Sequence, residues 1–128
     1  MKLEQQVCSL ELSKKLKELG VKQESLFSWV DVRLNYKEKD IRYQLVFKCQ
    51  KFYRDEVSAF TVAELLDLLP AGTTILKRTD ITTKTIARYY VETCEQYNKD
   101  WYDENPANAC AKMLIYLLEN NLLTPPKE

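Results

Sequence analysis

The sequence contains no histidine and only two glycines, Gly20 and Gly72. Imidazole is the usual general base beside a nucleophilic cysteine and a frequent zinc ligand, so its absence argues against both kinds of site. A loop that cradles phosphate needs several glycines, because the backbone amides must approach the anion closely, and no stretch of this chain offers them. These absences predict a protein that is not an enzyme and has no catalytic residue, metal site or cofactor.

Closely spaced cysteines are also missing, because Cys8, Cys49, Cys94 and Cys110 lie far apart in the sequence. Zinc ligands normally arrive in pairs two to four residues apart, so this spacing argues against a zinc site and for reduced, buried thiols. The first residues contain no hydrophobic run for export, and no segment is apolar enough over a sufficient length to cross a bilayer. We therefore expect a cytoplasmic protein with no membrane partner.

An excess of charge of either sign is absent as well, since 19 basic and 19 acidic residues give a net charge of zero. No field of the whole protein then attracts nucleic acid, which disfavours nucleic acid as the partner. The length of 128 residues is enough to bury a core without disulfides or metals. It predicts a single domain over residues 1–128.

The most apolar stretch covers residues 105–123, NPANACAKMLIYLLENNLL. Asn105 has the side chain of an N-cap and is followed by a proline at the first helical position, so a helix is expected to begin here. Its polar positions form one narrow stripe, and the rest of the circumference is apolar, which is typical of a helix buried in a core or an interface. A sheet is expected to cover one broad face, and either the first helix or a second copy of the protein to cover the other. The stripe consists of Asn108, Lys112, Tyr116 and Glu119.

Two further helices have clear boundary signals. Leucines recur at helical spacing in residues 10–19, and Gly20 follows as the left-handed residue that often ends a helix. Thr61 and Glu64 have the spacing of a capping box, and Pro70 ends the short helix that they begin.

Strand patterns fill the intervals between these helices. Apolar and polar residues alternate in residues 30–34 and 41–50, and their short polar connection predicts an antiparallel hairpin. A second β-rich region covers residues 74–78 and 85–94, although a helical face also fits the latter and its β-branched and aromatic composition favours a strand. The chain is thus predicted to be α+β in the order αββαββα, with an antiparallel sheet of about four strands in two hairpins and three helices packed mainly on one face.

Aromatic side chains are interleaved with basic ones in residues 29–54. Such residues can form a sheet face on which bases stack beside cations, or they can pack the sheet against the helices. The acidic stretch of residues 92–104 lacks the ligand spacing and the turn glycine of a calcium loop, so a solvated connection is the favoured interpretation. The candidate interaction residues are Trp29, Arg33, Arg42, Lys48 and Tyr116.

Three segments carry a family resemblance: CSLELSKKLKELGVKQESLFSW (residues 8–29), FTVAELLDLLP (60–70) and ANACAKMLIYLLENNLL (107–123). They resemble a recurrent family of small uncharacterised proteins encoded in bacterial genomes, phages and prophages. The resemblance implies a phage or prophage origin. It implies no activity, cofactor or catalytic residue, because no function is established for that family.

The leading hypothesis is a non-enzymatic cytoplasmic protein that acts by binding another protein or itself, as a homodimer. It rests on the nearly all-round apolar last helix and on the missing catalytic residues. The alternative is a nucleic-acid-binding protein that uses the hairpin of residues 29–54. A third hypothesis, an enzyme with an acidic site, predicts a deep pocket with several convergent carboxylates.

Overall fold

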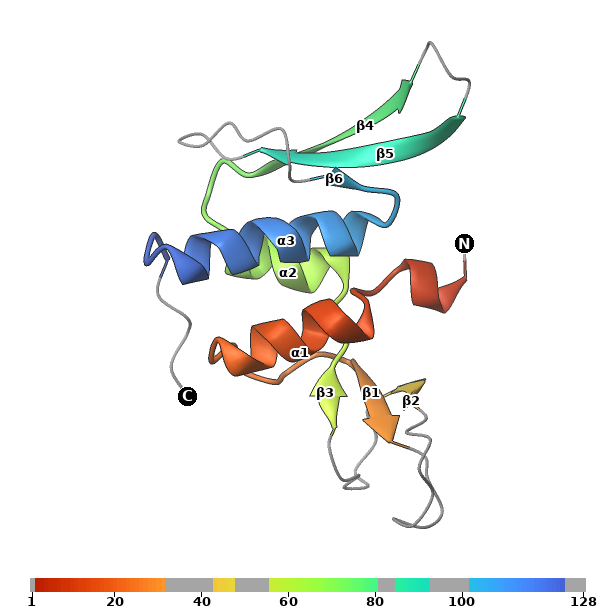
Figure 1. Ribbon diagram of the computed structural model, residues 1–128, viewed down its shortest axis with the longest axis vertical. Coiled ribbons are helices and arrows are strands. Elements are labelled where there is room, and N and C mark those ends of the chain that lie inside the picture. Colours follow the sequence, from red (N-terminus) through yellow and green to blue (C-terminus); the bar gives the residue numbers. More distant parts are fainter. Residues whose placement is uncertain (1, 32–42, 48–55, 81–84, 93–101, 124–128) are drawn as a thin grey trace.

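The computed structural model describes residues 2–31, 43–47, 56–80, 85–92 and 102–123, with the side chains of residues 78–80 and 85–87 left aside. Figure 1 shows the elements in layers. A sheet built from β4, β5 and β6 lies against the helices α2 and α3, α1 follows, and a second sheet built from β1, β2 and β3 lies beyond α1. The helices therefore lie between two sheets.

Each α-helix begins at a residue whose side chain accepts a hydrogen bond from the first turn. These caps are Ser9, Thr61 and Asn105, and Thr61 belongs to the predicted capping box. At the end of the first helix, Gly20 has a φ of 89°, in the left-handed region where glycine has no steric penalty. The helices are the short 3-10 helix η1 (Leu3–Gln5), α1 (Leu10–Glu18), α2 (Val62–Leu68) and α3 (Pro106–Glu119).

Both sheets are antiparallel and three-stranded within the described residues. The first has the strand order β2-β1-β3 and the second the order β4-β5-β6. The long hairpin of β4 and β5 contains one register shift, between Arg78 and Asp80. The strands are β1 (Phe27–Asp31), β2 (Tyr43–Phe47), β3 (Val57–Ser58), β4 (Thr74–Asp80), β5 (Thr85–Glu92) and β6 (Tyr102–Asp103).

The central helix α3 is covered by its own chain. It contacts α1, α2, β5 and β6, which together surround most of its circumference. Both broad apolar faces are thereby buried, and the first helix rather than a second copy meets α3 on the side away from the sheet. Its buried residues are Ala107, Ala109, Cys110, Ala111, Met113, Leu114, Leu117 and Leu118.

The polar stripe of α3 also bonds within the chain. Asn108, Lys112 and Glu119 each reach a different neighbouring segment. The stripe therefore fixes the helix against its surroundings instead of simply facing water. The partner atoms are the Ser9 amide at 2.7 Å, Asp103 Oδ2 at 2.9 Å and Lys15 Nζ at 3.1 Å, respectively.

The α+β class, the three helices and the two predicted hairpins are confirmed, but the predicted arrangement is wrong in two respects. The described residues form two sheets of three strands rather than one sheet of about four, so the order is αβββαβββα instead of αββαββα, and the helices lie between the sheets rather than mainly on one face. The additional strands β3 and β6 have two residues each, too few for a period-two pattern to be recognised. The question of residues 85–94 is answered for residues 85–92, which form the strand β5.

Candidate functional site

One face of the hairpin formed by β1 and β2 carries a row of large aromatic and apolar side chains. In the antiparallel register Phe27 lies opposite Phe47, and Trp29 lies opposite Leu45, so all four belong to the same face. Tyr43, two residues before Leu45 on β2, continues the row. We call these five residues the β1–β2 aromatic face. None of them is fully buried.

The middle and one end of this face differ. In the middle the indole N–H of Trp29 donates to the Cys8 carbonyl at 3.1 Å, which ties β1 to the segment before α1. At one end the rings of Phe27 and Phe47 pack edge to face with their centroids 5.6 Å apart. Phe47 nevertheless leaves 62% of its surface exposed, the largest value among the exposed large apolar residues of the described chain. The face is thus anchored by Trp29 and presents Phe47 to solvent.

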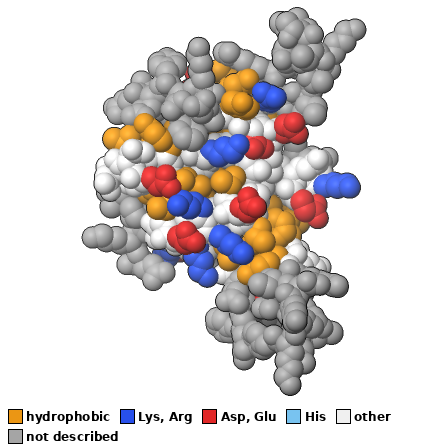
Figure 2. Space-filling model, in the orientation of Figure 1, with side chains coloured by type: hydrophobic (Ala, Val, Ile, Leu, Met, Phe, Trp, Pro, Cys, Tyr) orange, Lys and Arg blue, Asp and Glu red, His pale blue; other side chains and the backbone are white. Residues whose placement is uncertain are grey.

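The charges beside the aromatic face are mixed in sign. Lys14 of α1 places its ammonium 4.6 Å from the centre of the Tyr43 ring, a cation–π distance. Asp31 lies opposite Tyr43 in the register and adds a negative charge. Figure 2 likewise shows acidic and basic side chains interspersed over the helical layers rather than segregated. The described surroundings of this face therefore have no excess of positive charge.

The structure places the predicted interaction residues in different regions. Trp29 belongs to the β1–β2 aromatic face, whereas Tyr116 is half-buried on α3 and packs against the core. The helix α1 lies between α3 and β1, so these two residues do not form one surface (Figure 1). Arg33, Arg42 and Lys48 lie outside the described residues.

The exposed pair Phe27 and Phe47 was not among the residues singled out from the sequence. The pair becomes visible only when the register of the hairpin is known, because the two residues are distant in sequence. The alternating pattern indicated both strands, but no Asn-Gly turn fixed their pairing. Phe47 was recognisable as an aromatic residue in a strand, although its exposure was not.

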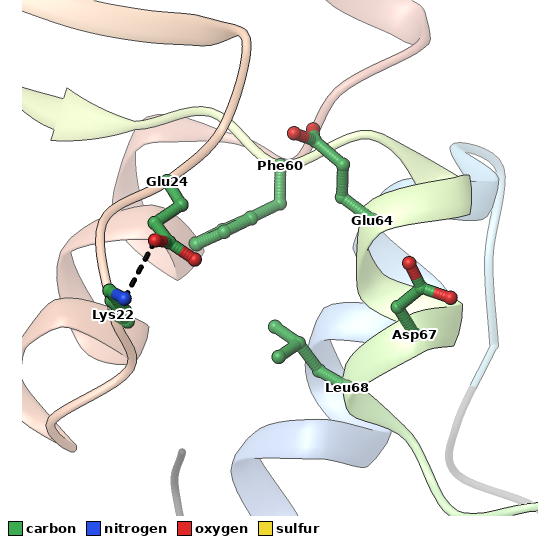
Figure 3. A pocket seen from close by; sticks show the side chains of 6 residues that line it. All are labelled: Lys22, Glu24, Phe60, Glu64, Asp67 and Leu68. Atoms are coloured by element: carbon green, nitrogen blue, oxygen red, sulfur yellow. Dashed lines mark ion pairs between the residues drawn. The ribbon is translucent and has the colours of Figure 1, made fainter. Parts of the chain in front are cut away.

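A small open pocket lies between α2 and the segment that precedes β1 (Figure 3). Its volume is about 210 Å³, below the range of about 300–1,000 Å³ in which small-molecule sites usually fall. Apolar side chains line it beside carboxylates and a Lys22–Glu24 ion pair of 2.8 Å. The lining residues are Lys22, Glu24, Phe60, Glu64, Asp67 and Leu68.

Both carboxylate oxygens of Glu64 are already used by the chain. Oε1 accepts hydrogen bonds from Ser25 Oγ at 2.8 Å and from the Thr61 amide at 2.9 Å. Oε2 accepts from the Leu26 amide at 3.0 Å. Glu64 therefore joins the N-terminus of α2 to the entry of β1, and the side of the pocket that it forms is a structural junction rather than a set of free acids.

The two described cysteines are buried free thiols. Burial raises the pKa of the Cys8 thiol above its ordinary value and raises the pKa of the Cys110 thiol to about 12. Hydrogen bonding to Ser13, with Sγ and Oγ 3.0 Å apart, partly opposes the effect at Cys8. Since the thiolate is the nucleophilic form, both groups are held in their unreactive state at neutral pH.

Part of the acidic stretch of residues 92–104 has a structural role. Asp103 accepts from the Asn105 amide at 2.9 Å and pairs with Lys112, so it fixes the entry of α3. Glu95 and Asp100 lie outside the described residues. In the part of the chain that the structure describes, no group of three or more acidic residues and cysteines is placed to hold a metal ion.

Comparison of the chain with protein-family models, curated proteins and solved structures finds no match. No helix in the described ranges is both long enough and apolar enough to cross a membrane.

Proposed function

We propose that this protein is a non-enzymatic binding protein whose β1–β2 aromatic face docks onto another protein. The observation that carries the proposal is Phe47, a phenylalanine with 62% of its surface exposed that packs on Phe27 beside half-buried Trp29 and Leu45. Aromatic residues are enriched at protein interfaces, and a cluster of exposed apolar groups marks interaction surfaces.

The charges of this face favour a protein over nucleic acid as its partner. Lys14 and Asp31 have opposite signs and both lie at the Tyr43 end. A nucleic-acid site depends on a local excess of Lys and Arg, which supplies most of the non-specific affinity. Such an excess on this hairpin depends on Arg33, Arg42 and Lys48, which the structure does not describe.

We do not propose self-association through the last helix, because α3 is covered by α1, α2, β5 and β6 of the same chain. A homodimer through the aromatic face is the alternative form of the proposal. The free, buried thiols of Cys8 and Cys110 support a reducing, cytoplasmic location. A phage or prophage origin is a further part of the proposal and rests on the sequence resemblance alone.

No chemical reaction is assigned to the protein. Three observations support this assignment: the volume of about 210 Å³ of the pocket beside α2, the hydrogen bonds that both Glu64 carboxylate oxygens already accept, and the raised pKa values of Cys8 and Cys110. None of these groups is a free base or an activated nucleophile.

The test is affinity capture from a nuclease-treated lysate of the native host with matched variants. Phe47→Ser removes the exposed ring, and Leu122→Ser removes a similarly exposed leucine (51%) that follows α3. We expect a defined set of captured proteins to be lost with Phe47→Ser and kept with Leu122→Ser, because an exposed anchor typically contributes about 2 kcal/mol or more to an interface. Equal capture by both variants contradicts the proposal. Light scattering on the purified protein identifies the homodimer, whose mass must fall to that of the monomer in Phe47→Ser.

A further inference from the structure

The backbone of Phe27 shows how β1 and β2 are bonded to each other. Its amide donates to Ser25 Oγ at 3.1 Å, and its carbonyl accepts from the Ala59 amide at 2.8 Å. Both groups therefore point away from β2, although Phe27 lies directly opposite Phe47 in the register. Phe27 and Phe47 thus form one of the pairs of an antiparallel ladder that exchange no backbone hydrogen bonds.

The outer edge of β2 follows from this pair. Hydrogen-bonded and non-hydrogen-bonded pairs alternate along an antiparallel ladder, so Gln44 and Val46 bond to β1, and the residues between them have their amides and carbonyls on the other edge. Within the described residues no strand pairs with β2 on that edge, because β2 is the outer strand of the order β2-β1-β3 (Figure 1). The outward-pointing backbone groups belong to Tyr43, Leu45 and Phe47.

The other outer strands of the two described sheets carry features that oppose the addition of a strand. The Ser58 amide of β3 donates to Gln23 Oε1 at 2.8 Å, and the Tyr102 carbonyl of β6 accepts from Lys112 Nζ at 3.1 Å. β4 carries the exposed Lys77 and a register shift. Occupied edge groups, lysines and irregular register are common means of preventing edge-to-edge pairing. By contrast, the sequence of β2, YQLVF, contains no charged residue and no proline.

This sequence is also complementary to itself. When two antiparallel copies of β2 are centred on Leu45, Tyr43 of each copy lies opposite Phe47 of the other. The residues with outward backbone groups then face one another, so each of these pairs can exchange two backbone hydrogen bonds. The same register sets aromatic rings opposite each other, which is a favourable cross-strand pair, and sets no like charges opposite each other.

The geometry points to a second copy of this chain as the occupant of the edge: we propose that two molecules pair their β2 strands antiparallel about a two-fold axis at Leu45. The two sheets of β1, β2 and β3 then form one continuous sheet in a closed dimer. Phe47, with 62% of its surface exposed, gains Tyr43 of the second copy as a neighbour. An extended peptide of another protein can add to the same kind of edge, but the self-complementary register favours the second copy.

This inference rests on the proposed function, because it specifies a partner for the same exposed hairpin. The two use different groups of that hairpin. Docking of another protein depends on the Phe47 ring, whereas the pairing depends on backbone amides at the edge of β2. Side chains and amides can be tested separately, so either proposal can fail without the other.

The experiment measures amide hydrogen exchange of the full chain by NMR at low and high protein concentration, with sedimentation velocity to give the fraction of dimer. The Leu45 amide points outward, so its exchange is expected to slow about tenfold when about nine-tenths of the molecules are paired. The Gln44 amide bonds to β1 within the same chain and is the matched control. Its protection is expected to be the same at both concentrations.

Two variants at position 45 separate the amide from the side chain. Leu45→Pro removes the outward N–H but no hydrogen bond to β1, and proline is tolerated in an edge strand where the N–H faces solvent. It is expected to weaken dimerisation more than about tenfold, because both central hydrogen bonds are lost. Leu45→Ala keeps the amide and is expected to weaken dimerisation by about fivefold or less. Circular dichroism shows whether each variant is folded.

Three results overturn the pairing. The first is a wild-type protein that stays monomeric at every concentration. The second is a dimer whose Leu45 amide exchanges equally fast at both concentrations, which places the contact on side chains instead of the edge. The third is a folded Leu45→Pro variant that dimerises like the wild type; if this variant does not fold, the exchange of the wild-type Leu45 amide decides.

The outcomes also distinguish this inference from the proposed function. A monomer whose captured host proteins are lost with Phe47→Ser overturns the pairing and supports the docking of another protein. A dimer with a protected Leu45 amide, whose captured proteins are the same with Phe47→Ser and Leu122→Ser, supports the pairing and overturns that docking.

Discussion

The substitution Asn105→Ala removes a side chain that bonds both to the first turn of α3 and to the distant N-terminal segment. Its Oδ1 accepts hydrogen bonds from the amides of Ala107 and Asn108 at 2.8 and 3.3 Å, which caps α3. Its Nδ2 donates to the Val7 carbonyl at 2.9 Å and to the Glu4 carbonyl at 3.4 Å. One amide therefore both begins the central helix and fastens the N-terminal segment to it.

The two functions have separable magnitudes. Loss of an N-cap costs about 1 kcal/mol of unfolding free energy, within a range of roughly 0.5–2 kcal/mol. Val7 is fully buried, so its carbonyl loses a partner where water does not easily replace it, at a cost of about 1–3 kcal/mol. We expect Asn105→Ala to lower the free energy of unfolding by about 2–4 kcal/mol.

The matched variant Asn105→Asp separates the contribution of the helix cap from that of the bond to the Val7 carbonyl. Aspartate keeps an acceptor for the helix amides and is favourable at a helix N-terminus, so the cap is retained. It has no N–H for the Val7 carbonyl. Asn105→Asp is therefore expected to lose only the contribution of the bond to the Val7 carbonyl, about 1–3 kcal/mol of unfolding free energy, and Asn105→Ala is expected to be the less stable variant.

Urea unfolding followed by far-UV circular dichroism measures these differences. Asn120→Ala is the control, because Asn120 Nδ2 donates to the Tyr116 carbonyl at 2.8 Å in an exposed position at the other end of α3. Its cost is expected to stay within about 0.5 kcal/mol. A change of less than about 0.5 kcal/mol for Asn105→Ala refutes the reasoning, since it means that neither bond contributes to stability.

Three other outcomes are expected. Glu64→Ala breaks the capping box and leaves the Leu26 amide without its acceptor, so chemical unfolding should show a loss of about 2–3 kcal/mol in the free energy of unfolding. The control is Asp67→Ala, also on the pocket wall, which should change this free energy by less than about 0.5 kcal/mol. Met113→Ala opens a cavity in the core and should cost about 2–5 kcal/mol by the same assay; a smaller loss means that α3 is not buried. With its pKa raised to about 12, Cys110 should react with iodoacetamide near pH 8 about a thousandfold more slowly in the native protein than in urea. Mass-spectrometric site mapping measures the two rates, and equal rates contradict the burial of this thiol.

The sequence predicted the helices best, because their signals are local. The N-cap at Asn105, the capping box at Thr61 and the left-handed residue Gly20 all occur as expected. The strands β3 and β6 were missed because two residues cannot show alternation, and they complete the two sheets. The all-round apolar character of α3 indicated burial but not its cause, which is the position of the helix between helices and a sheet of its own chain.

The candidate site was harder to predict than the fold. Trp29 could be selected from the sequence because it is an aromatic residue among basic ones, and the structure gives it an anchoring contact with the Cys8 carbonyl. The exposed pair Phe27 and Phe47 depends on hairpin register, which is a long-range property. Tyr116 was selected from the sequence, but the structure places it half-buried against the core. Its position in a polar stripe does not mean that it is exposed, because neighbouring elements cover the stripe.

The most direct test of the proposed function is photo-cross-linking from position 47 inside the native host. A benzophenone amino acid in place of Phe47 is expected to yield a discrete covalent adduct with one partner protein, or with a second copy of the chain. The same group in place of Leu122 is expected to yield none, although that position is exposed to a similar degree. Absence of an adduct from position 47, or the same adducts from both positions, contradicts the proposal that the β1–β2 aromatic face is an interaction surface.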